Sequence, residues 1–379
     1  MSKVLIVDIS GKVRFYDRVL FHALRENCID EVIITLLIPG NGLLRIIPRK
    51  YSNSTHIIKR LLKVIEGLLN YIYLLYYLFL NRVDVLHFQW LPFLEVCSLE
   101  YYYFKILKFF FPKLKIVLTV HNIYPHNSSV TKKNHYNLRF RRIAPLLDRF
   151  IVHTKNSKNE VVHEFGIDDR NIEIIHHGIF IPKGYTPKTK KIPQSGKWCL
   201  IMFGNQSLYK GTDIFIKSLQ LLPDIIKNKV RAIICGKTDD AFLKELQSVD
   251  TGVEIIWKPT FLNSDELYSL IDNSDIILLP YRAISQSGVL LLSLFFRKIM
   301  ITSDLPSFKE TLIGFSDDMF FKNGDAHSLA NLICKYVGGS IDGTRQFNCI
   351  DNLNAIYSWD KSAIETMSLY EKLFYTKSC

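Results

Sequence analysis

Two glycine-containing polar segments in the second half of the sequence each follow an apolar run that is typical of a buried strand. The first, FGNQSLYKG, contains Gly204, Asn205, Lys210 and Gly211. The second, YRAISQSGV, contains Ser285, Gln286, Ser287, Gly288 and Val289. Glycine permits a tight turn, and the free N–H groups at the start of a helix attract anions. Together with the charge of Lys210, these segments predict a diphosphate-binding site.

Both segments also have a purely structural interpretation. Lys210 could be a surface lysine in front of a glycine that ends a turn, and Ser285 or Ser287 could cap the next helix. Because two such loops follow neighbouring strands, they favour phosphate binding more strongly than either loop would alone.

A second polar group follows the predicted strands of the first half. Its members are Ser10, Gly11, His87, Gln89, Trp90, His121, Asn122 and His126. Imidazoles, amides and hydroxyls hydrogen-bond to sugar hydroxyls, and an indole packs against a sugar ring. Zinc binding by the histidines is a weaker alternative, because no neighbouring thiol or carboxylate completes a ligand set. The sequence also lacks a D-x-D motif, so we expect a sugar acceptor here and no metal.

The hydrophobic pattern alternates short β-branched runs with longer amphipathic runs, which predicts two doubly wound α/β domains. We expect strands at residues 4–8, 32–37, 83–88, 115–120, 149–153, 199–203, 231–235, 253–257, 275–279 and 298–302. Helices are expected at residues 17–25, 57–80, 101–110, 212–221, 240–248, 264–272 and 288–296. Residues 183–197, rich in Pro, Gly and Lys, form the predicted linker between domains at 1–182 and 198–355.

The net charge of +12 is distributed unevenly along the 379 residues. Residues 1–190 hold 28 Lys and Arg against 15 Asp and Glu, a net +13, and the remainder is −1. This asymmetry favours a polyanionic partner for the first half. The lysines that interleave with Phe and Tyr in residues 101–115 favour an anionic membrane surface. The alternative is a core helix whose lysines extend along it to solvent.

Several features of the sequence indicate the cellular compartment of the protein. The apolar stretch LLNYIYLLYYLFL, residues 68–80, is shorter than the ~20 residues that span a bilayer. The start, MSKVLIVDIS, predicts a strand rather than a signal peptide. The seven cysteines are scattered and odd in number, which favours reduced thiols. We therefore expect a cytoplasmic protein, peripheral at the inner face of the plasma membrane.

Taken together, these segments resemble glycosyltransferase family 4 of the GT-B fold, in which two Rossmann-like domains face each other across a cleft. The segments, in order, are DVLHFQW, LTVHNIYPH, DRFIVHTKNSKNEVVHEFGI, IIHHGI, FGNQSLYKGTDIFIKSL, DIILLPYRAISQSGVLLLSLFFRK, FFKNGDAHSLANLI and YSWDKSAIETMSLYEKL. The resemblance implies that His121 lies near the donor sugar and Lys210 binds the donor diphosphate. It further implies that residues 285–288 hold sugar and phosphate, and that residues 356–379 form a helix crossing back to the first domain.

Two features differ from the family pattern. The family usually carries two glutamates beside the phosphate-binding helix, whereas here no acidic residue lies between Tyr281 and Asp304. Gln286 and Ser293 fall near the expected places, and Asn205 replaces the usual arginine. Both differences concern contacts to the donor sugar, whereas Lys210 and the glycine-containing loops are kept.

The function expected from the resemblance is transfer of a hexose from a UDP- or GDP-sugar, with retention and without metal or cofactor. The expected acceptor is a polyprenyl-diphosphate-linked or oligosaccharide chain in O-antigen, capsule or exopolysaccharide synthesis. Two alternatives are a nucleotide-sugar 2-epimerase and a catalytically silent partner of another glycosyltransferase. Nucleic acid is not expected as a partner, because the sequence contains no helix-turn-helix, zinc-finger or base-stacking pattern.

Overall fold

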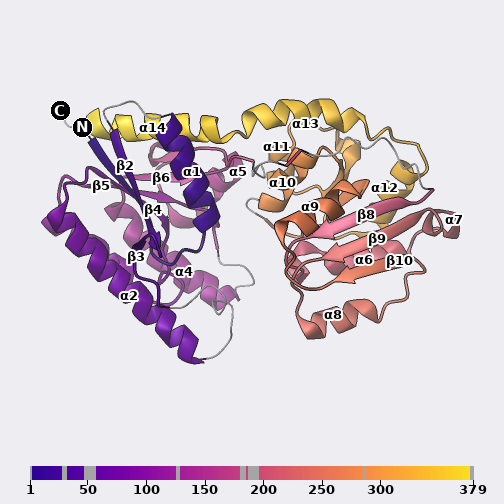
Figure 1. Cartoon of the computed structure of the whole chain (residues 1–379), viewed down its shortest axis with the longest axis horizontal. Helices are drawn as coiled ribbons and strands as arrows, with labels where there is room; N and C mark the ends of the chain where they lie inside the picture. The colour runs from indigo at the N-terminus through magenta and orange to yellow at the C-terminus, as the bar shows by residue number, and fades with distance from the viewer. Residues whose placement is uncertain are drawn as a thin grey trace. The chain divides into compact units, whose positions relative to one another are not determined.

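The computed structural model describes residues 2–27, 32–46, 57–124, 129–179, 185–186, 196–284 and 287–375. It divides into two compact units, Met1–Gly178 with Trp359–Cys379 and Ile179–Ser358 (Figure 1). The boundaries therefore lie at 178/179 and 358/359, a few residues from the predicted ones. Most of the predicted linker, 183–197, lies outside the described residues.

Unit 1 contains a seven-stranded parallel sheet in the order β3-β2-β1-β4-β5-β6-β7. The strands are β1 Ser2–Asp8, β2 Val32–Pro39, β3 Gly42–Leu43, β4 Val85–Trp90, β5 Lys115–Thr119, β6 Arg149–Val152 and β7 Ile172–Ile174. The helices are α1 Arg14–Glu26, α2 Ile57–Leu80, α3 Leu99–Phe110, α4 Val130–Ile143, α5 Lys155–Phe165 and α14 Trp359–Tyr375. The apolar strands are covered on both faces, as a parallel sheet requires.

Unit 2 contains a six-stranded parallel sheet in the order β10-β9-β8-β11-β12-β13. The strands are β8 Trp198–Phe203, β9 Val230–Cys235, β10 Glu254–Lys258, β11 Ile276–Leu279, β12 Ile299–Ser303 and β13 Phe320–Phe321. Its longer helices are α6 Thr212–Gln220, α8 Asp240–Gln247, α9 Ser264–Asp272, α10 Gly288–Phe296, α12 Ala326–Val337 and α13 Arg345–Ile356. Shorter helices are α7 Asp224–Lys227 and α11 Pro306–Thr311, and Leu208–Lys210 is the 3-10 helix η4.

The strand orders confirm the predicted doubly wound α/β architecture. In each sheet the chain reverses its direction of strand addition, between β1 and β4 in unit 1 and between β8 and β11 in unit 2. Ligands of such sheets bind at the carboxyl ends of the strands beside this switch point. The polar residues singled out in the sequence lie after β1 and β5 and within the last part of β4 in unit 1, and after β8 and β11 in unit 2.

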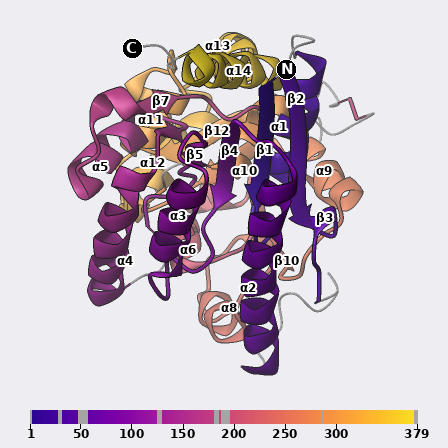
Figure 2. The same cartoon turned by 90° about the vertical axis from the view of Figure 1, so that its left-hand side faces the viewer.

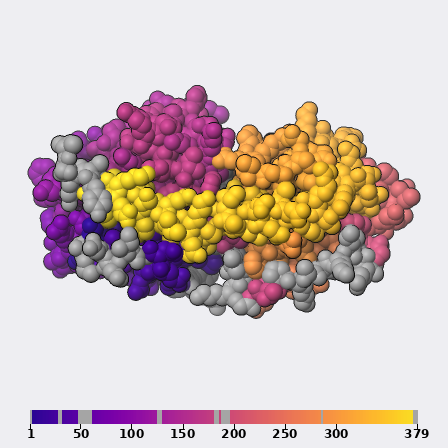
Figure 3. Space-filling model, turned by 90° about the horizontal axis from the view of Figure 1, so that it is seen from above, coloured from indigo at the N-terminus to yellow at the C-terminus, as the bar shows by residue number. Residues whose placement is uncertain are grey.

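The last helix, α14, belongs to unit 1 although the residues before it belong to unit 2. It appears in yellow on the surface of the molecule, next to the indigo N-terminal segments (Figure 3). Tyr370 on α14 places its hydroxyl 2.6 Å from Nδ1 of His87, and the Ser362 hydroxyl donates to the carbonyl of His176. Helices α2, α3 and α4 cover the face of unit 1 seen in Figure 2.

Candidate active site

The Lys210 side chain lies in a buried position in unit 2. It is 6% exposed, and its Nζ lies 5.2 Å from the centroid of the Tyr281 ring. A Cβ atom added to Gly204 would lie 2.7 Å from this Nζ, so the ammonium rests against the glycine backbone. Burial lowers the pKa of Lys210. Among the residues that the structure places, no carboxylate forms an ion pair with Lys210, so its buried charge lacks an anion.

Gly211 allows the loop of Lys210 to pack against the end of β11. Its φ is +74°, and an added Cβ would lie 1.8 Å from the carbonyl oxygen of Pro280. Arg282 holds the two loops together, because its guanidinium donates two hydrogen bonds to Asp213 at 2.7 and 2.6 Å. Its backbone N–H also donates to the carbonyl of Tyr209. The two loops singled out in the sequence are therefore adjacent and rigidly connected.

The loop after β11 also has a structural function. The Ser287 hydroxyl accepts a hydrogen bond from the N–H of Leu290 at 3.1 Å and so caps α10. Val289 is half-buried beside Gly204, and Gly288 and Asn205 are exposed. Ser293 is buried and donates to the carbonyl of Val289, one turn earlier in the helix. Ser285 and Gln286 lie outside the described residues.

Unit 1 brings together histidines from the ends of several strands. His121 follows β5, His153 follows β6 and His177 follows β7, and Tyr16 of α1 lies among them. The Tyr16 ring is 4.7 Å from the His121 ring, 5.5 Å from His153 and 5.0 Å from His177. Trp359 of α14 closes the cluster at 5.2 Å from Tyr16. Only His121 of these residues was a predicted site residue.

Hydrogen bonds define the protonation of His121. Nδ1 of His153 is 2.9 Å from the carbonyl oxygen of Ile175, which requires a proton on this nitrogen. Neutral His153 therefore accepts at Nε2, which lies 3.2 Å from Nδ1 of His121. His121 thus carries its proton on Nδ1. Its Nε2 is 3.3 Å from Oε1 of Gln89; because Nε2 carries no proton in this tautomer, the Gln89 amide must be rotated so that its NH2 group donates to Nε2.

Burial keeps these histidines neutral. It lowers the pKa of His121 well below the usual value, with smaller contributions from the neighbouring imidazoles. Burial also lowers the pKa of His153 to about 4 and that of His177 to about 3. The lone pair on Nε2 of neutral His121 is able to accept a hydrogen bond.

His87 has a different environment from the one expected for an acceptor contact. Its side chain is completely buried, with Nδ1 2.6 Å from the Tyr370 hydroxyl and Nε2 2.7 Å from the Thr119 hydroxyl. Burial lowers the pKa of His87 to about 3. Because both ring nitrogens are engaged, the geometry favours a supporting role that joins β4, β5 and α14. Gln89 is buried as well and lies between His87 and His121.

Ser10 and Gly11 use their backbone donors within the loop after β1. The Asp8 carboxylate accepts hydrogen bonds from the N–H groups of Ser10, Gly11 and Val13 and from the Ser10 hydroxyl. Asp17 of α1 is buried nearby, and burial raises its pKa to about 9. Burial also raises the pKa of Asp8. The Asp8 carboxylate therefore fixes the loop through its four hydrogen bonds.

The other predicted acceptor residues border a small cavity. Trp90, His121 and Asn122 line a space of about 30 Å³ together with Tyr136 and Phe140 of α4. This volume accommodates one water molecule. His126 lies outside the described residues.

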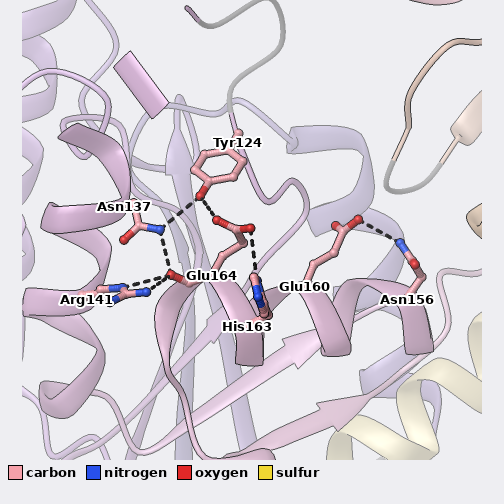
Figure 4. Close-up of polar contacts among 7 residues, drawn as sticks. All are labelled: Tyr124, Asn137, Arg141, Asn156, Glu160, His163 and Glu164. Atoms are coloured by element: carbon pink, nitrogen blue, oxygen red, sulfur yellow. Dashed lines mark hydrogen bonds and ion pairs between the residues drawn. The ribbon is translucent and has the colours of Figure 1, made fainter. Parts of the chain in front are cut away.

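A polar network anchors the segment that follows Asn122 (Figure 4). The Tyr124 hydroxyl donates to Oε2 of Glu164 on α5 at 2.5 Å, and Asn137 of α4 donates to the carbonyl of Glu164 at 2.7 Å. Arg141 donates to the same carbonyl. The Tyr124 hydroxyl is the main cause of the lowered pKa of Glu164. The network connects α4 and α5 to the loop that carries His121.

Comparisons with known proteins identify the chain. Residues 20–181 match the model of Glycosyltransferase Family 4, and residues 186–344 match that of Glycosyl transferases group 1. The chain belongs to glycosyltransferase family 4. No curated protein matches its sequence significantly.

Solved structures show that this family 4 glycosyltransferase has the GT-B fold. Sucrose-phosphate synthase from Thermosynechococcus elongatus is 15% identical with a TM-score of 0.70, and each chain is covered completely. HepE of Anabaena, solved with UDP and glucose, is 16% identical with a TM-score of 0.64, over 98% of this chain and 99% of HepE. The lipopolysaccharide outer core galactosyltransferase WaaB is 13% identical with a TM-score of 0.61, over 97% and 99%.

Sequence reasoning missed His153, His177, Tyr16, Trp359 and Tyr370 as parts of the site. A signal existed, because His121 and His153 each follow directly the apolar run of a predicted strand. Within the described ranges, no group of three or more His, Cys, Asp or Glu side chains is arranged to hold a metal.

Proposed function

We propose that this family 4 glycosyltransferase moves a hexose from a UDP- or GDP-sugar to a lipid-linked or oligosaccharide acceptor. The observation that carries the proposal is the buried ammonium of Lys210, which lies between two connected loops and has no anionic partner among the described residues. A donor diphosphate supplies that anion. HepE is similar in fold and was solved with UDP and glucose, which supports a nucleotide-sugar donor.

The leaving diphosphate gains negative charge as the sugar departs, and this charge needs a stabilising partner. We assign that role to Lys210 and the N–H groups of the loops 204–211 and 285–289, in place of a divalent metal. Gln286, Ser287 and His121 would hold the sugar in place of the family's glutamate pair. Retention of the anomeric configuration is part of the same proposal.

The acceptor side of the proposal uses unit 1. Trp90, Asn122 and His126 would contact the acceptor, and Gln89 and His87 would hold His121 in position. The fold likeness to WaaB agrees with a pathway that builds a surface polysaccharide. The proposed location is the cytoplasmic face of the plasma membrane, where lipid-linked acceptors are accessible.

The test is turnover of labelled UDP- and GDP-hexoses by the purified full-length protein, with lipid-linked acceptors, in the presence and absence of excess chelator. We expect release of the nucleoside diphosphate at the same rate in both conditions, because Lys210 carries the charge that a metal would carry. Loss of turnover on chelation, restored by magnesium or manganese, would show that the metal-free mechanism is wrong.

The absence of acidic residues between Tyr281 and Asp304 favours a second candidate, a silent partner that binds a nucleotide sugar without turning it over. The same experiment separates the two functions. Binding of the nucleotide sugar by calorimetry without any release of diphosphate would favour the silent partner.

Replacement of His121 is expected to have the largest effect on activity among substitutions in unit 1. We expect His121→Ala to lower turnover about tenfold, because a lost neutral hydrogen bond contributes about 0.5–1.5 kcal/mol. Asn122→Ala is the matched comparison, since it truncates the adjacent residue of the same loop. Turnover of His121→Ala equal to that of wild type would exclude a contact between His121 and the transferred sugar.

A further inference from the structure

Helix α2 carries a stripe of exposed apolar side chains along one side. Leu68, Ile72, Tyr76 and Phe79 recur at helical spacing and are exposed, and Ile72 is 65% exposed. The helix contains no charged residue after Glu66. Soluble monomers seldom expose contiguous apolar patches of this extent. The outer face of α2 is therefore suited to contact an apolar phase.

The inner face of α2 fixes the helix to the sheet. Asn70 is buried, accepts a hydrogen bond from the N–H of Leu44 at 2.8 Å and donates to the carbonyl of Ile9. The Glu66 carboxylate accepts from the N–H of Ile46 at 2.6 Å. Tyr71, Leu74 and Leu78 belong to the hydrophobic core. One side of the helix is thus anchored to unit 1 by polar groups and by residues of the hydrophobic core, while its other side is apolar.

Within the described part of the chain, residues Leu61–Leu80 form a helix long and apolar enough to cross a membrane, and 33% of it is buried. Spanning would require Asn70 and Glu66 to leave their partners on the sheet. A helix that is anchored on one side and apolar on the other is suited to lie flat in the membrane interface.

Helix α3 extends this apolar surface. Tyr102, Ile106 and Phe109 are exposed, Phe109 by 79%. The ring centroid of Phe110 lies 5.4 Å from that of Phe79 on α2. Both helices lie on the face of unit 1 that is turned to the viewer in Figure 2. We call this shared surface the α2–α3 face.

A cationic hollow lies where the two helices end. It has a volume of about 730 Å³, and its charged lining residues are Arg82, Asp84, Lys113 and Lys115, of which Lys115 is paired with Asp148 at 3.4 Å. The Arg82 side chain is 79% exposed, so its guanidinium is accessible to a ligand. Its Nη2 lies 3.5 Å from Oδ1 of Asp84. Lys113 is exposed too. Cations beside an apolar, aromatic surface match the two parts of an anionic phospholipid, its acyl chains and its phosphate headgroup.

We propose that the α2–α3 face docks onto an anionic phospholipid bilayer, with Arg82 and Lys113 at the headgroups. This inference deepens the proposed function, on which it rests for the need to reach a lipid-linked acceptor. Tyrosine and phenylalanine at the edge of the patch are typical of a membrane interface.

The test is co-sedimentation of the full-length protein with vesicles of phosphatidylcholine alone or mixed with phosphatidylglycerol, at low and high salt. We expect at least tenfold tighter binding to the mixed vesicles at low salt, and weaker binding as salt rises, because the electrostatic part is screened. Phe79→Gln with Phe110→Gln should reduce binding to the mixed vesicles at least tenfold. Arg82→Gln with Lys113→Gln should remove most of the salt dependence.

The controls change the same chemistry on unit 2. Phe261→Gln removes a side chain that is 87% exposed, and Lys229→Gln with Lys244→Gln removes two exposed charges. Both should bind vesicles like wild type. Equal binding of wild type to neutral and anionic vesicles would overturn the proposal, and so would full binding by the Phe79 and Phe110 variant. A dimer in sedimentation velocity that these two substitutions abolish would assign the face to a second copy.

Binding of nucleoside diphosphate in solution separates this inference from the proposed function. The Phe79 and Phe110 variant and the Arg82 and Lys113 variant should bind it like wild type, because their changes lie in unit 1 whereas Lys210 lies in unit 2. Vesicle binding without sugar transfer would support the docking surface and show that the proposed transferase function is wrong. Sugar transfer to a soluble acceptor without vesicle binding would refute the docking surface alone.

Discussion

Lys210→Ala is expected to weaken binding of a nucleoside diphosphate about 10- to 150-fold, because a hydrogen bond to a charged group contributes about 1.5–3 kcal/mol. Transfer activity should fall by a similar factor or more. The expectation follows from the geometry, in which the ammonium is buried against Gly204 and the Tyr281 ring without an anionic partner among the described residues. Calorimetry with UDP and with GDP measures the effect directly.

The same substitution should not destabilise the free protein. A buried ammonium that lacks an anion is costly, as the lowered pKa of Lys210 indicates, so its removal should leave the melting temperature unchanged or higher. Lys217→Ala, on the exposed face of α6, is the matched control for loss of one positive charge. Wild-type diphosphate affinity in Lys210→Ala would refute the phosphate role, whereas a large loss of stability would indicate a structural role.

Acidification should destabilise unit 1 between about pH 6.5 and pH 4. Burial lowers the pKa of the four histidines His87, His121, His153 and His177 below the value of ~6.5 in the unfolded chain. In this window the unfolded state binds protons at these sites and the folded state does not, so stability falls as pH falls. Each histidine contributes about 1.4 kcal/mol per pH unit.

Buried carboxyls act in the opposite direction. Burial raises the pKa of Asp8, that of Asp17 to about 9 and that of Glu100 to about 7, so their folded forms hold protons that the unfolded chain has released. Burial raises the pKa of Glu160 as well. These carboxyls therefore offset part of the histidine contribution, and the net slope is smaller than the sum over the four histidines.

Hydrogen exchange of the amides in β4, β5 and β6 at several pH values isolates the stability of unit 1 in the full-length protein. His153→Asn should reduce the slope by about 1.4 kcal/mol per pH unit. His163→Gln, at a histidine whose side chain is 87% exposed, should leave the slope unchanged. Equal slopes for wild type and His153→Asn between pH 7 and pH 5 would show that His153 is not held neutral in the folded protein.

Elements with a strong hydrophobic pattern were predictable from the sequence. Helices 57–80, 264–272 and 288–296 were predicted with the bounds that the structure has, because each is a long periodic run. The strands β3 and β13 have two residues each, too few to show a period, and they were missed. Helices α4 and α5 were missed too, since their apolar residues are few and widely spaced.

The candidate site was predictable where its residues lie close together in the sequence. Gly204, Lys210 and Gly211 lie within eight residues, so a short segment revealed the buried cation. The histidine cluster is assembled from five elements and depends on the pairing of strands and on α14, which no local pattern reveals. His87 shows the limit clearly, because it lies inside β4 rather than at its end, and its ring points into the protein.

The assignment of α14 to unit 1 determines when that unit can be completed during synthesis. Residues 359–375 are translated after all of unit 2, yet they supply Trp359 beside Tyr16 and Tyr370 beside His87. The nascent first unit therefore has His87 without one of its two partners until α14 has been synthesised. A chain that stops before residue 359 would keep the loops around Lys210 in unit 2 but leave unit 1 without Trp359 and Tyr370.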